Sequence, residues 1–261
     1  MKKKLDQLLT AQEYGQLVKA GKKYFGLTNV TLTGGEPLLR SDLLDIIQVI
    51  KKEVVHVTVV TNGSLLDKNI DSIKLVDELH VSFHSFDQNE WSRITRSGTK
   101  VMNQVQQNII NTRKHYPDLM IKLNIVSEKG NNSKNSIRQY LKFAQENNLI
   151  LSVFQESYIR WAKTMNMHVE IDIEAEPWWD ITPFTPVLIN RQRRKDVFKI
   201  ENVIVALCYT SVEKPDMESI WIDPYGYAYM DIYKKSQSVN LKQIVISNDK
   251  NIIRLKEILI A

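Results

Sequence analysis

Short apolar runs alternate with amphipathic stretches along the first 160 residues, and this alternation restricts the fold more than any other feature. The runs predict strands at residues 29–33, 56–61, 78–85, 119–127 and 149–156. Helical periodicity predicts helices at residues 10–25, 41–53, 87–115 (with a break near Gly98) and 136–148. Strands that alternate with helices form βαβ units with right-handed crossovers. We therefore expect an α/β fold with a largely parallel sheet.

The alternation ends after residue 160, and a different organisation is expected for the last third of the chain. Residues 176–187 contain three prolines and two tryptophans, which predicts an ordered irregular segment. Residues 219–231 predict a β-hairpin with its turn at residues 223–226, and residues 249–260 predict a closing helix. We expect two domains, one at residues 1–160 and an extension at residues 161–261.

The composition is that of a globular protein, with 43% hydrophobic and 25% charged residues among 261. No apolar run approaches the roughly 20 residues of a membrane span, and the N-terminus lacks the apolar core of a secretory signal. A cytoplasmic location without a membrane partner is therefore expected. The net charge of +5 is spread along the chain, apart from the basic patch at residues 191–195, so nucleic acid is not an expected partner.

Glycines and small polar residues gather where the predicted strands end. Gly34-Gly35 closes the first strand, Asn62-Gly63 the second, and Ser82 to Ser85 the third. The carboxyl ends of parallel strands share one edge of a sheet or barrel, and ligands bind at that edge. Glycines without a Cβ let the backbone approach a ligand, and Glu36 offers a carboxylate to an ammonium group. A plain glycine turn between strand and helix would explain the same residues without a ligand.

Four motifs in order, TGGEPLLRSDLLDII, VTVVTNGSLL, LHVSFHSFDQNEW and IKLNIVSEKGNN, resemble the radical S-adenosylmethionine (SAM) superfamily. The chain is most similar to the MoaA-like branch of molybdenum-cofactor and peptide-modifying enzymes, over roughly residues 10–160. This resemblance implies a partial (β/α) barrel with SAM across the strand ends. It also implies an enzyme that reductively cleaves SAM to a 5′-deoxyadenosyl radical, which abstracts hydrogen from a substrate.

The resemblance also assigns cofactor-binding roles to individual residues. Gly34, Gly35 and Glu36 would receive the methionine amino group of SAM. Ser82 and Asn124 would face the cofactor at their strand ends, and Thr61 and Lys122 would face cofactor or substrate. Structural roles are the alternative, because Ser82 could satisfy a neighbouring carbonyl and Asn124 could connect two strands. No catalytic residue acting on the substrate is indicated.

This sequence lacks the cysteine ligands that hold the iron–sulfur cluster of the family. A [4Fe–4S] cluster is held there by three thiolates of a CxxxCxxC loop, whereas Cys208 is the single cysteine of this chain. We therefore expect no metal site. We interpret the chain as a truncated form that lacks the first strand and the cluster loop of the family. The full enzyme would also need an electron donor. A lone cysteine such as Cys208 is more often a small buried hydrophobe than a ligand.

Two other functions remain open. The chain could be a natural cluster-free pseudoenzyme that partners an intact paralogue, or an unrelated TIM-like aldolase using Lys122, although the GGE string argues against the latter. The substrate, a peptide or a small molecule, is not defined, because Thr31 replaces a basic residue of MoaA and the last third has no recognisable motif. His84 is either a ligand or acid–base group or a structural histidine. The role of the Trp178-Trp179 segment stays open.

Overall fold

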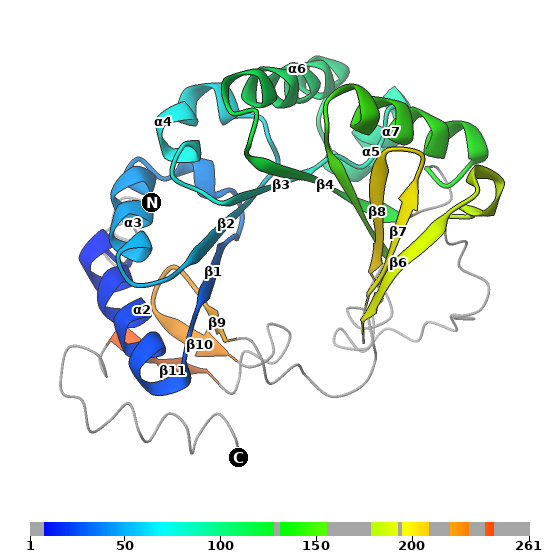
Figure 1. Ribbon diagram of the computed structural model, residues 1–261. Coiled ribbons are helices and arrows are strands. Elements are labelled where there is room, and N and C mark those ends of the chain that lie inside the picture. Colours follow the sequence, from blue (N-terminus) through cyan, green and yellow to red (C-terminus); the bar gives the residue numbers. More distant parts are fainter. Residues whose placement is uncertain are drawn as a thin grey trace, which may run out of the picture. The chain divides into compact units, whose positions relative to one another are not determined.

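The structure is a computed structural model that describes residues 8–127, 131–155, 179–192, 195–208, 220–229 and 238–242 (Figure 1). Two compact units divide the chain: unit 1 contains residues 1–58 and 213–261, and unit 2 contains residues 59–212. Among the described residues, no helix combines the length and the apolar character that a membrane span requires. The closing helix predicted at residues 249–260 lies outside the described residues, as does Trp178.

Unit 1 combines the first elements of the chain with three short strands near its end. In chain order its elements are α2 (Ala11–Phe25), β1 (Asn29–Leu32), η1 (Pro37–Leu39), α3 (Leu43–Lys51), the start of β2 (His56–Thr61), β9 (Trp221–Ile222), β10 (Tyr227–Tyr229) and β11 (Val239–Asn240). Helices α2 and α3 pack together, and β9 and β11 pair antiparallel to β10 in a separate sheet. The predicted hairpin at residues 219–231 is thus confirmed for β9 and β10.

Helix α2 shows how local sequence sets an element boundary. Thr10 accepts a hydrogen bond from the Glu13 backbone N–H, and the Glu13 carboxylate accepts one from the Thr10 N–H in return. This reciprocal cap satisfies N–H groups that the first helical turn leaves free. At the other end Gly26, with φ +68°, adopts the left-handed conformation that closes helices. The predicted helix at residues 10–25 is therefore confirmed to within one residue.

A small apolar core joins the two sequence segments of unit 1. Leu9 and Leu17 are buried against Ala228 and Leu241, which come from the second segment. The Leu9 N–H donates a 2.8 Å hydrogen bond to the carbonyl oxygen of Pro224. Removing these apolar side chains from water stabilises the contact by about 25 cal/mol for each Å² buried.

Unit 2 contains the rest of the βα alternation and three further strands. Its elements are the end of β2, η2 (Leu66–Asn69), α4 (Ile70–Ile73), β3 (Glu78–Ser82), α5 (Gln88–Thr95), α6 (Thr99–His115), β4 (Met120–Ser127), α7 (Lys134–Glu146), β5 (Ile150–Gln155), η3 (Thr182–Phe184), β6 (Val187–Gln192), β7 (Lys195–Ile200) and β8 (Val203–Cys208). Strands β3, β4, β5 and β8 pair in parallel, and β7 and β6 continue this sheet antiparallel.

The two faces of the unit 2 sheet differ in chemistry because successive strand residues point to opposite sides. One face carries fully buried aliphatic side chains such as Leu79, Val81 and Leu123, and the helices of unit 2 cover it (Figure 1). The opposite face carries polar residues at the alternate positions, and we call it the inner face. On β3, β4 and β5 the polar residues of the inner face are Glu78, His80, Ser82, Lys122, Asn124 and Ser152.

The structure confirms the predicted strands of the first 160 residues and corrects the prediction for the following part. Strand β3 ends at Ser82 rather than at residue 85, and the helical stretch at 87–115 is two helices, with Gly98 capping the second. After residue 160 three strands that the sequence did not predict, β6, β7 and β8, follow one another without a helix between them. The proposed domain boundary near residue 160 stays a prediction.

Candidate functional site

The seven predicted site residues divide between the two units. Gly34, Gly35 and Glu36 belong to unit 1, whereas the remaining four, Thr61, Ser82, Lys122 and Asn124, belong to unit 2. In unit 1 the three residues follow β1 directly and lead into η1. In unit 2 Ser82 and Asn124 lie opposite each other on β3 and β4, so the structure brings these two together.

The two glycines after β1 have different reasons to lack a side chain. Gly34 has φ +138°, a conformation that residues with a Cβ rarely adopt. Gly35 does not have such a φ, and an added Cβ would meet nothing within 4 Å at either glycine. The backbone therefore requires glycine at position 34, while open space lies beside both residues. A plain turn explains Gly34 but gives no reason for Gly35.

Glu36 has a structural task in the loop. It caps η1, and its Oε1 accepts a 3.0 Å hydrogen bond from the Leu38 backbone N–H. Pro37 follows at the first position of η1, where its missing N–H leaves no bond unsatisfied. The cap fixes the direction of the Glu36 side chain, and a fixed carboxylate is suited to hold an ammonium group.

A row of small polar residues crosses the inner face of unit 2. The strand register places Ser82 opposite Asn124, and Asn124 opposite Ser152. The Asn124 Oδ1 atom is buried and forms no hydrogen bond with the described residues. An unpaired buried amide oxygen is costly, so this acceptor fits a ligand that supplies an N–H or O–H donor. The row can hold a polar organic molecule.

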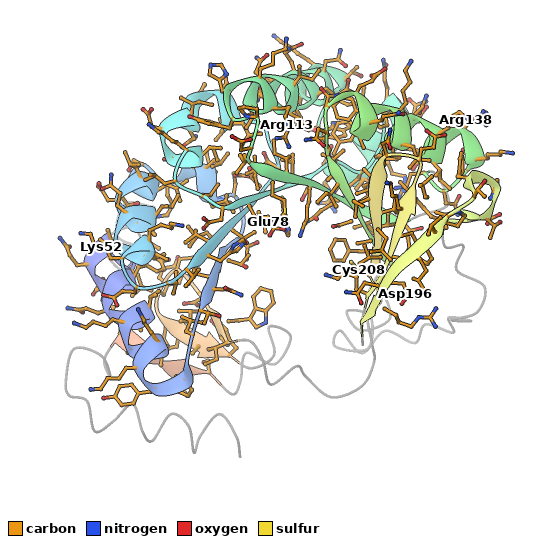
Figure 2. The ribbon with its side chains drawn as sticks, viewed as in Figure 1. Lys52, Glu78, Arg113, Arg138, Asp196 and Cys208 are labelled. Carbon is orange, nitrogen blue, oxygen red and sulfur yellow. The ribbon has the colours of Figure 1, made fainter. Side chains whose placement is uncertain are left out.

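A charged cluster lies at the beginning of the same strands, next to this row. Glu78 Oε1 is 2.5 Å from His80 Nε2 and also forms an ion pair with Lys122 Nζ. Figure 2 shows Glu78 on the side of the sheet away from the helices. Burial raises the pKa of Glu78, but the hydrogen bonds and charges of His80 and Lys122 outweigh it and hold the pKa at about 2. Lys122, predicted to face cofactor or substrate, is thus engaged by Glu78.

Sequence reasoning missed Glu78 and His80 as members of this cluster. The string ELHVS contains the signal: Leu79 and Val81 are buried on the helix side, so the residues that alternate with them, Glu78 and His80, must point inward. Glu78 was read only as the first residue of a strand.

Thr61 has a different environment from the inner row. It lies on the same face of β2 as Val57 and Val59, and all three side chains are buried. Its Oγ1 accepts a 3.0 Å hydrogen bond from the Gly63 N–H, and Asn108 Nδ2 donates to the Gly63 carbonyl oxygen. These contacts give Thr61 a structural task in the turn, and a contact with the cofactor stays a prediction.

His84 and Cys208 also have structural surroundings. His84 Nδ1 accepts a 3.3 Å hydrogen bond from the Val126 backbone N–H, which favours the structural role for this histidine. Burial raises the pKa of the Cys208 thiol, although the nearby Lys195 and Lys122 charges oppose this effect. A protonated thiol is a poor metal ligand. Within the described residues no three His, Cys, Asp or Glu side chains are grouped so that they could hold a metal ion.

Comparison with known proteins gives a consistent family result. The sequence profile of the Radical SAM superfamily matches residues 1–143. A probable GTP 3′,8-cyclase from Pyrococcus horikoshii is 32% identical over 153 residues, which are 58% of this chain and 47% of that protein. A GTP 3′,8-cyclase from Limosilactobacillus fermentum is 36% identical over 132 residues, 49% of this chain and 38% of that protein. The chain thus spans half or less of the length of these curated relatives.

The fold is also similar to a solved structure. The crystal structure of Streptococcus suis SuiB bound to S-adenosylmethionine matches with a TM-score of 0.59. The match covers 92% of this chain and 59% of SuiB, at 13% sequence identity. At that identity the similarity supports the shared fold and carries no information on the ligand of this chain.

Proposed function

The chain belongs to the radical SAM superfamily, and on this premise we propose that it binds SAM at the carboxyl ends of its parallel strands. The observation that carries the proposal is the inner row, where the buried Asn124 Oδ1 lacks a hydrogen-bond donor among the described residues. SAM carries an ammonium group, ribose hydroxyls and an adenine amino group, all of which are donors. In unit 1, the carboxylate of Glu36 complements the ammonium group, so the polar groups of each unit by themselves suit this cofactor.

The residues of this chain do not fit the iron–sulfur cluster of the family. Cys208 is the one cysteine in the sequence, and three thiolates are needed. When bound, the cluster supplies the electron that cleaves SAM reductively. We therefore propose that this chain alone binds SAM without cleaving it, and that cleavage belongs to a full enzyme with a cluster and an electron donor. Its cytoplasmic location and its small-molecule or peptide substrate are likewise proposals.

Titration calorimetry with SAM tests the assigned site. We expect Glu36→Ala to weaken SAM binding by about 1–3 kcal/mol, because a charge-assisted hydrogen bond is lost. Asn124→Ala should weaken binding by about 1 kcal/mol, because the ligand loses one acceptor. Glu146→Ala on the exposed side of α7 is the control and should bind as the parent does. Equal affinities for all four proteins would refute the site, and no SAM binding by the parent would refute the proposed function.

The glycine pair provides a second test with separable readouts. Gly34→Ala should lower the free energy of unfolding by about 1–2 kcal/mol, because alanine is strained at positive φ. Gly35→Ala should change the free energy of unfolding by less than about 0.5 kcal/mol. An added Cβ meets no atom there, and φ lies outside the positive range that disfavours side chains. If SAM lies against this loop, Gly35→Ala will nevertheless weaken SAM binding. Unchanged SAM binding in a stable Gly35→Ala protein would leave the turn as the full explanation of both glycines.

The single cysteine favours one alternative, a cluster-free pseudoenzyme that partners an intact paralogue. This alternative also permits SAM binding, and a stable complex between the two proteins would distinguish it. The aldolase alternative finds less support, because the ion pair with Glu78 occupies the Lys122 amine that an aldolase would use as its nucleophile.

A further inference from the structure

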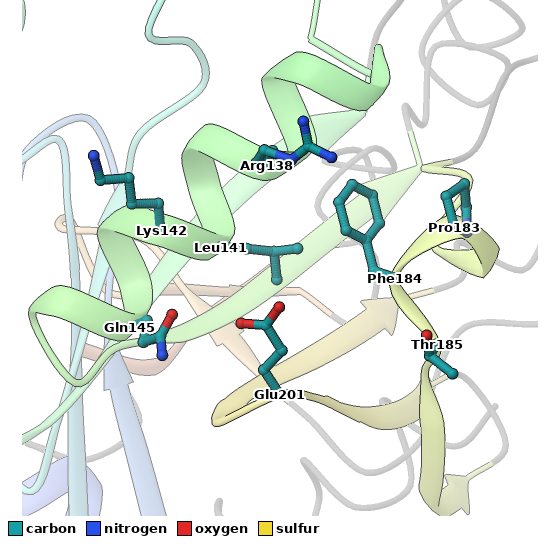
Figure 3. A pocket seen from close by; sticks show the side chains of 8 residues that line it. All are labelled: Arg138, Leu141, Lys142, Gln145, Pro183, Phe184, Thr185 and Glu201. Atoms are coloured by element: carbon teal, nitrogen blue, oxygen red, sulfur yellow. The ribbon is translucent and has the colours of Figure 1, made fainter.

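A surface groove in unit 2 lies on the helix-covered side of the sheet, opposite the inner face (Figure 3). Its volume is about 460 Å³, which is within the range of small-ligand sites. One wall is a stripe of helix α7 with Arg138, Leu141 and Gln145. The other wall consists of Phe184, at the end of η3, and Glu201, in the turn between β7 and β8.

Three charged side chains line this groove: Lys142, which lies 3.8 Å from Glu146 on the same helix, and the opposite charges Arg138 and Glu201, which do not pair with each other. Among the described residues, the side chains of Arg138 and Glu201 form neither a hydrogen bond nor an ion pair. The Arg138 guanidinium lies 6.0 Å from the centre of the Phe184 ring, within the range of a cation–π contact. Both charged groups are exposed, so each is available to a ligand.

The topology separates the two charges along the groove. Helix α7 ends shortly before β5, and β8 starts beside β5 in parallel, directly after the turn with Glu201. Glu201 therefore lies toward the Gln145 end of α7, while Arg138 lies toward Phe184, as Figure 3 shows. Arg138 and Gln145 are seven residues apart on the helix, which corresponds to about 10 Å along its axis.

The backbone on the second wall is unusual. Glu201 has φ +52° and Thr185 has φ +53°, and only two other non-glycine residues in the described parts of the chain have positive φ. Each such residue costs about 1–2 kcal/mol, and a two-residue hairpin turn ordinarily uses asparagine, aspartate or glycine there. Strained conformations concentrate at binding sites. In this conformation the Glu201 carboxylate points into the groove (Figure 3).

We propose that this groove binds a short extended peptide segment with a basic group at the Glu201 end and an acidic group at the Arg138 end. In an extended segment the first and third side chains point to the same side, so the two charged side chains would face the groove and the residue between them would act as a spacer. An extended chain advances about 3.3 Å per residue, so the separation of the charges corresponds to about three residues. A segment with like charges at its two ends would be repelled at one end of the groove. The site therefore favours a segment with opposite charges at its two ends. This site is separate from the proposed SAM site.

Peptide titrations with the complete chain test the proposal. The probes are three capped tripeptides, acetyl-Lys-Leu-Glu-amide and its all-basic and all-acidic counterparts, Lys-Leu-Lys and Glu-Leu-Glu. We expect the first peptide to bind at least about threefold more tightly than the other two. A difference of this size is what exposed ion pairs produce. Arg138→Glu should shift the preference to the basic peptide, and Glu201→Lys should shift it to the acidic one.

Lys134→Glu, an exposed position on the first turn of α7 outside the groove, is the matched control and should leave the preference unchanged. The proposal is overturned if none of the peptides binds, if the three bind equally, or if the substitutions in the groove do not change the order of affinities. Because the readout is a preference between peptides, a partial loss of folded protein does not imitate the expected result.

Discussion

Replacing Glu78 with glutamine is expected to lower the free energy of unfolding by about 3 kcal/mol at neutral pH. The folded protein holds the pKa of Glu78 at about 2, compared with 4.5 for a free carboxyl group, so folding favours the ionised form by that order of energy. The variant would leave Lys122 on the inner face without its carboxylate. Urea unfolding at pH 7 measures the difference.

The same substitution should change how stability depends on pH. The folded-state pKa of Glu78 lies below the unfolded value, so its contribution is complete above pH 4.5 and disappears as the pH falls toward about 2. The parent and Glu78→Gln should therefore differ at pH 7 and converge in acid. Glu146→Gln is the control, because its 3.8 Å contact with Lys142 is exposed and contributes less than about 1 kcal/mol. Similar losses in both variants would contradict the role given to the cluster.

Gly63→Ala is expected to have a comparably large effect, about 2–4 kcal/mol of destabilisation. An added Cβ would lie 2.8 Å from Val81 Cγ1 and 2.9 Å from Val105 Cγ1, too close for real atoms, and φ is +77°. Both the backbone strain and the crowding of the core therefore oppose alanine. Thermal unfolding followed by circular dichroism measures the loss.

Gly26→Ala separates these two causes. Gly26 also has positive φ, +68°, but an added Cβ there would meet no atom within 4 Å. We expect it to cost only the backbone strain, about 1 kcal/mol. A loss as large for Gly26→Ala as for Gly63→Ala would show that crowding against Val81 and Val105 is not the cause.

The alternation of apolar and amphipathic stretches predicted the strands that are joined by helices. It did not predict β6, β7 and β8, which follow one another without helices between them. β2 carries a run of buried residues, and β4 carries buried residues at alternate positions. β8, with the apolar sequence VIVALC, joins the same sheet in parallel, but β6 and β7 precede it as a hairpin. Within the basic patch at residues 191–195, Arg191 forms an ion pair with Asp196 across that hairpin.

The candidate site was partly predictable for a physical reason. Ser82 and Asn124 could be placed at one edge because parallel strands share their direction, and the structure confirms that they lie opposite each other. The pairing of Lys122 with Glu78 depends on the register between β3 and β4, which no local pattern encodes. Whether the seven predicted residues contact SAM stays a prediction for the titrations.

The composition of unit 1 from two distant segments has a consequence for synthesis on the ribosome. Unit 2 is continuous in the sequence, from residue 59 to residue 212, so all of its residues emerge together. Leu9 and α2 emerge before unit 2, but their partners Ala228 and Leu241 are made more than 200 residues later. The nascent chain must hold these apolar side chains unpaired until those later residues have been made. Unit 2 can therefore fold first, in contrast to the usual order in which N-terminal parts lead.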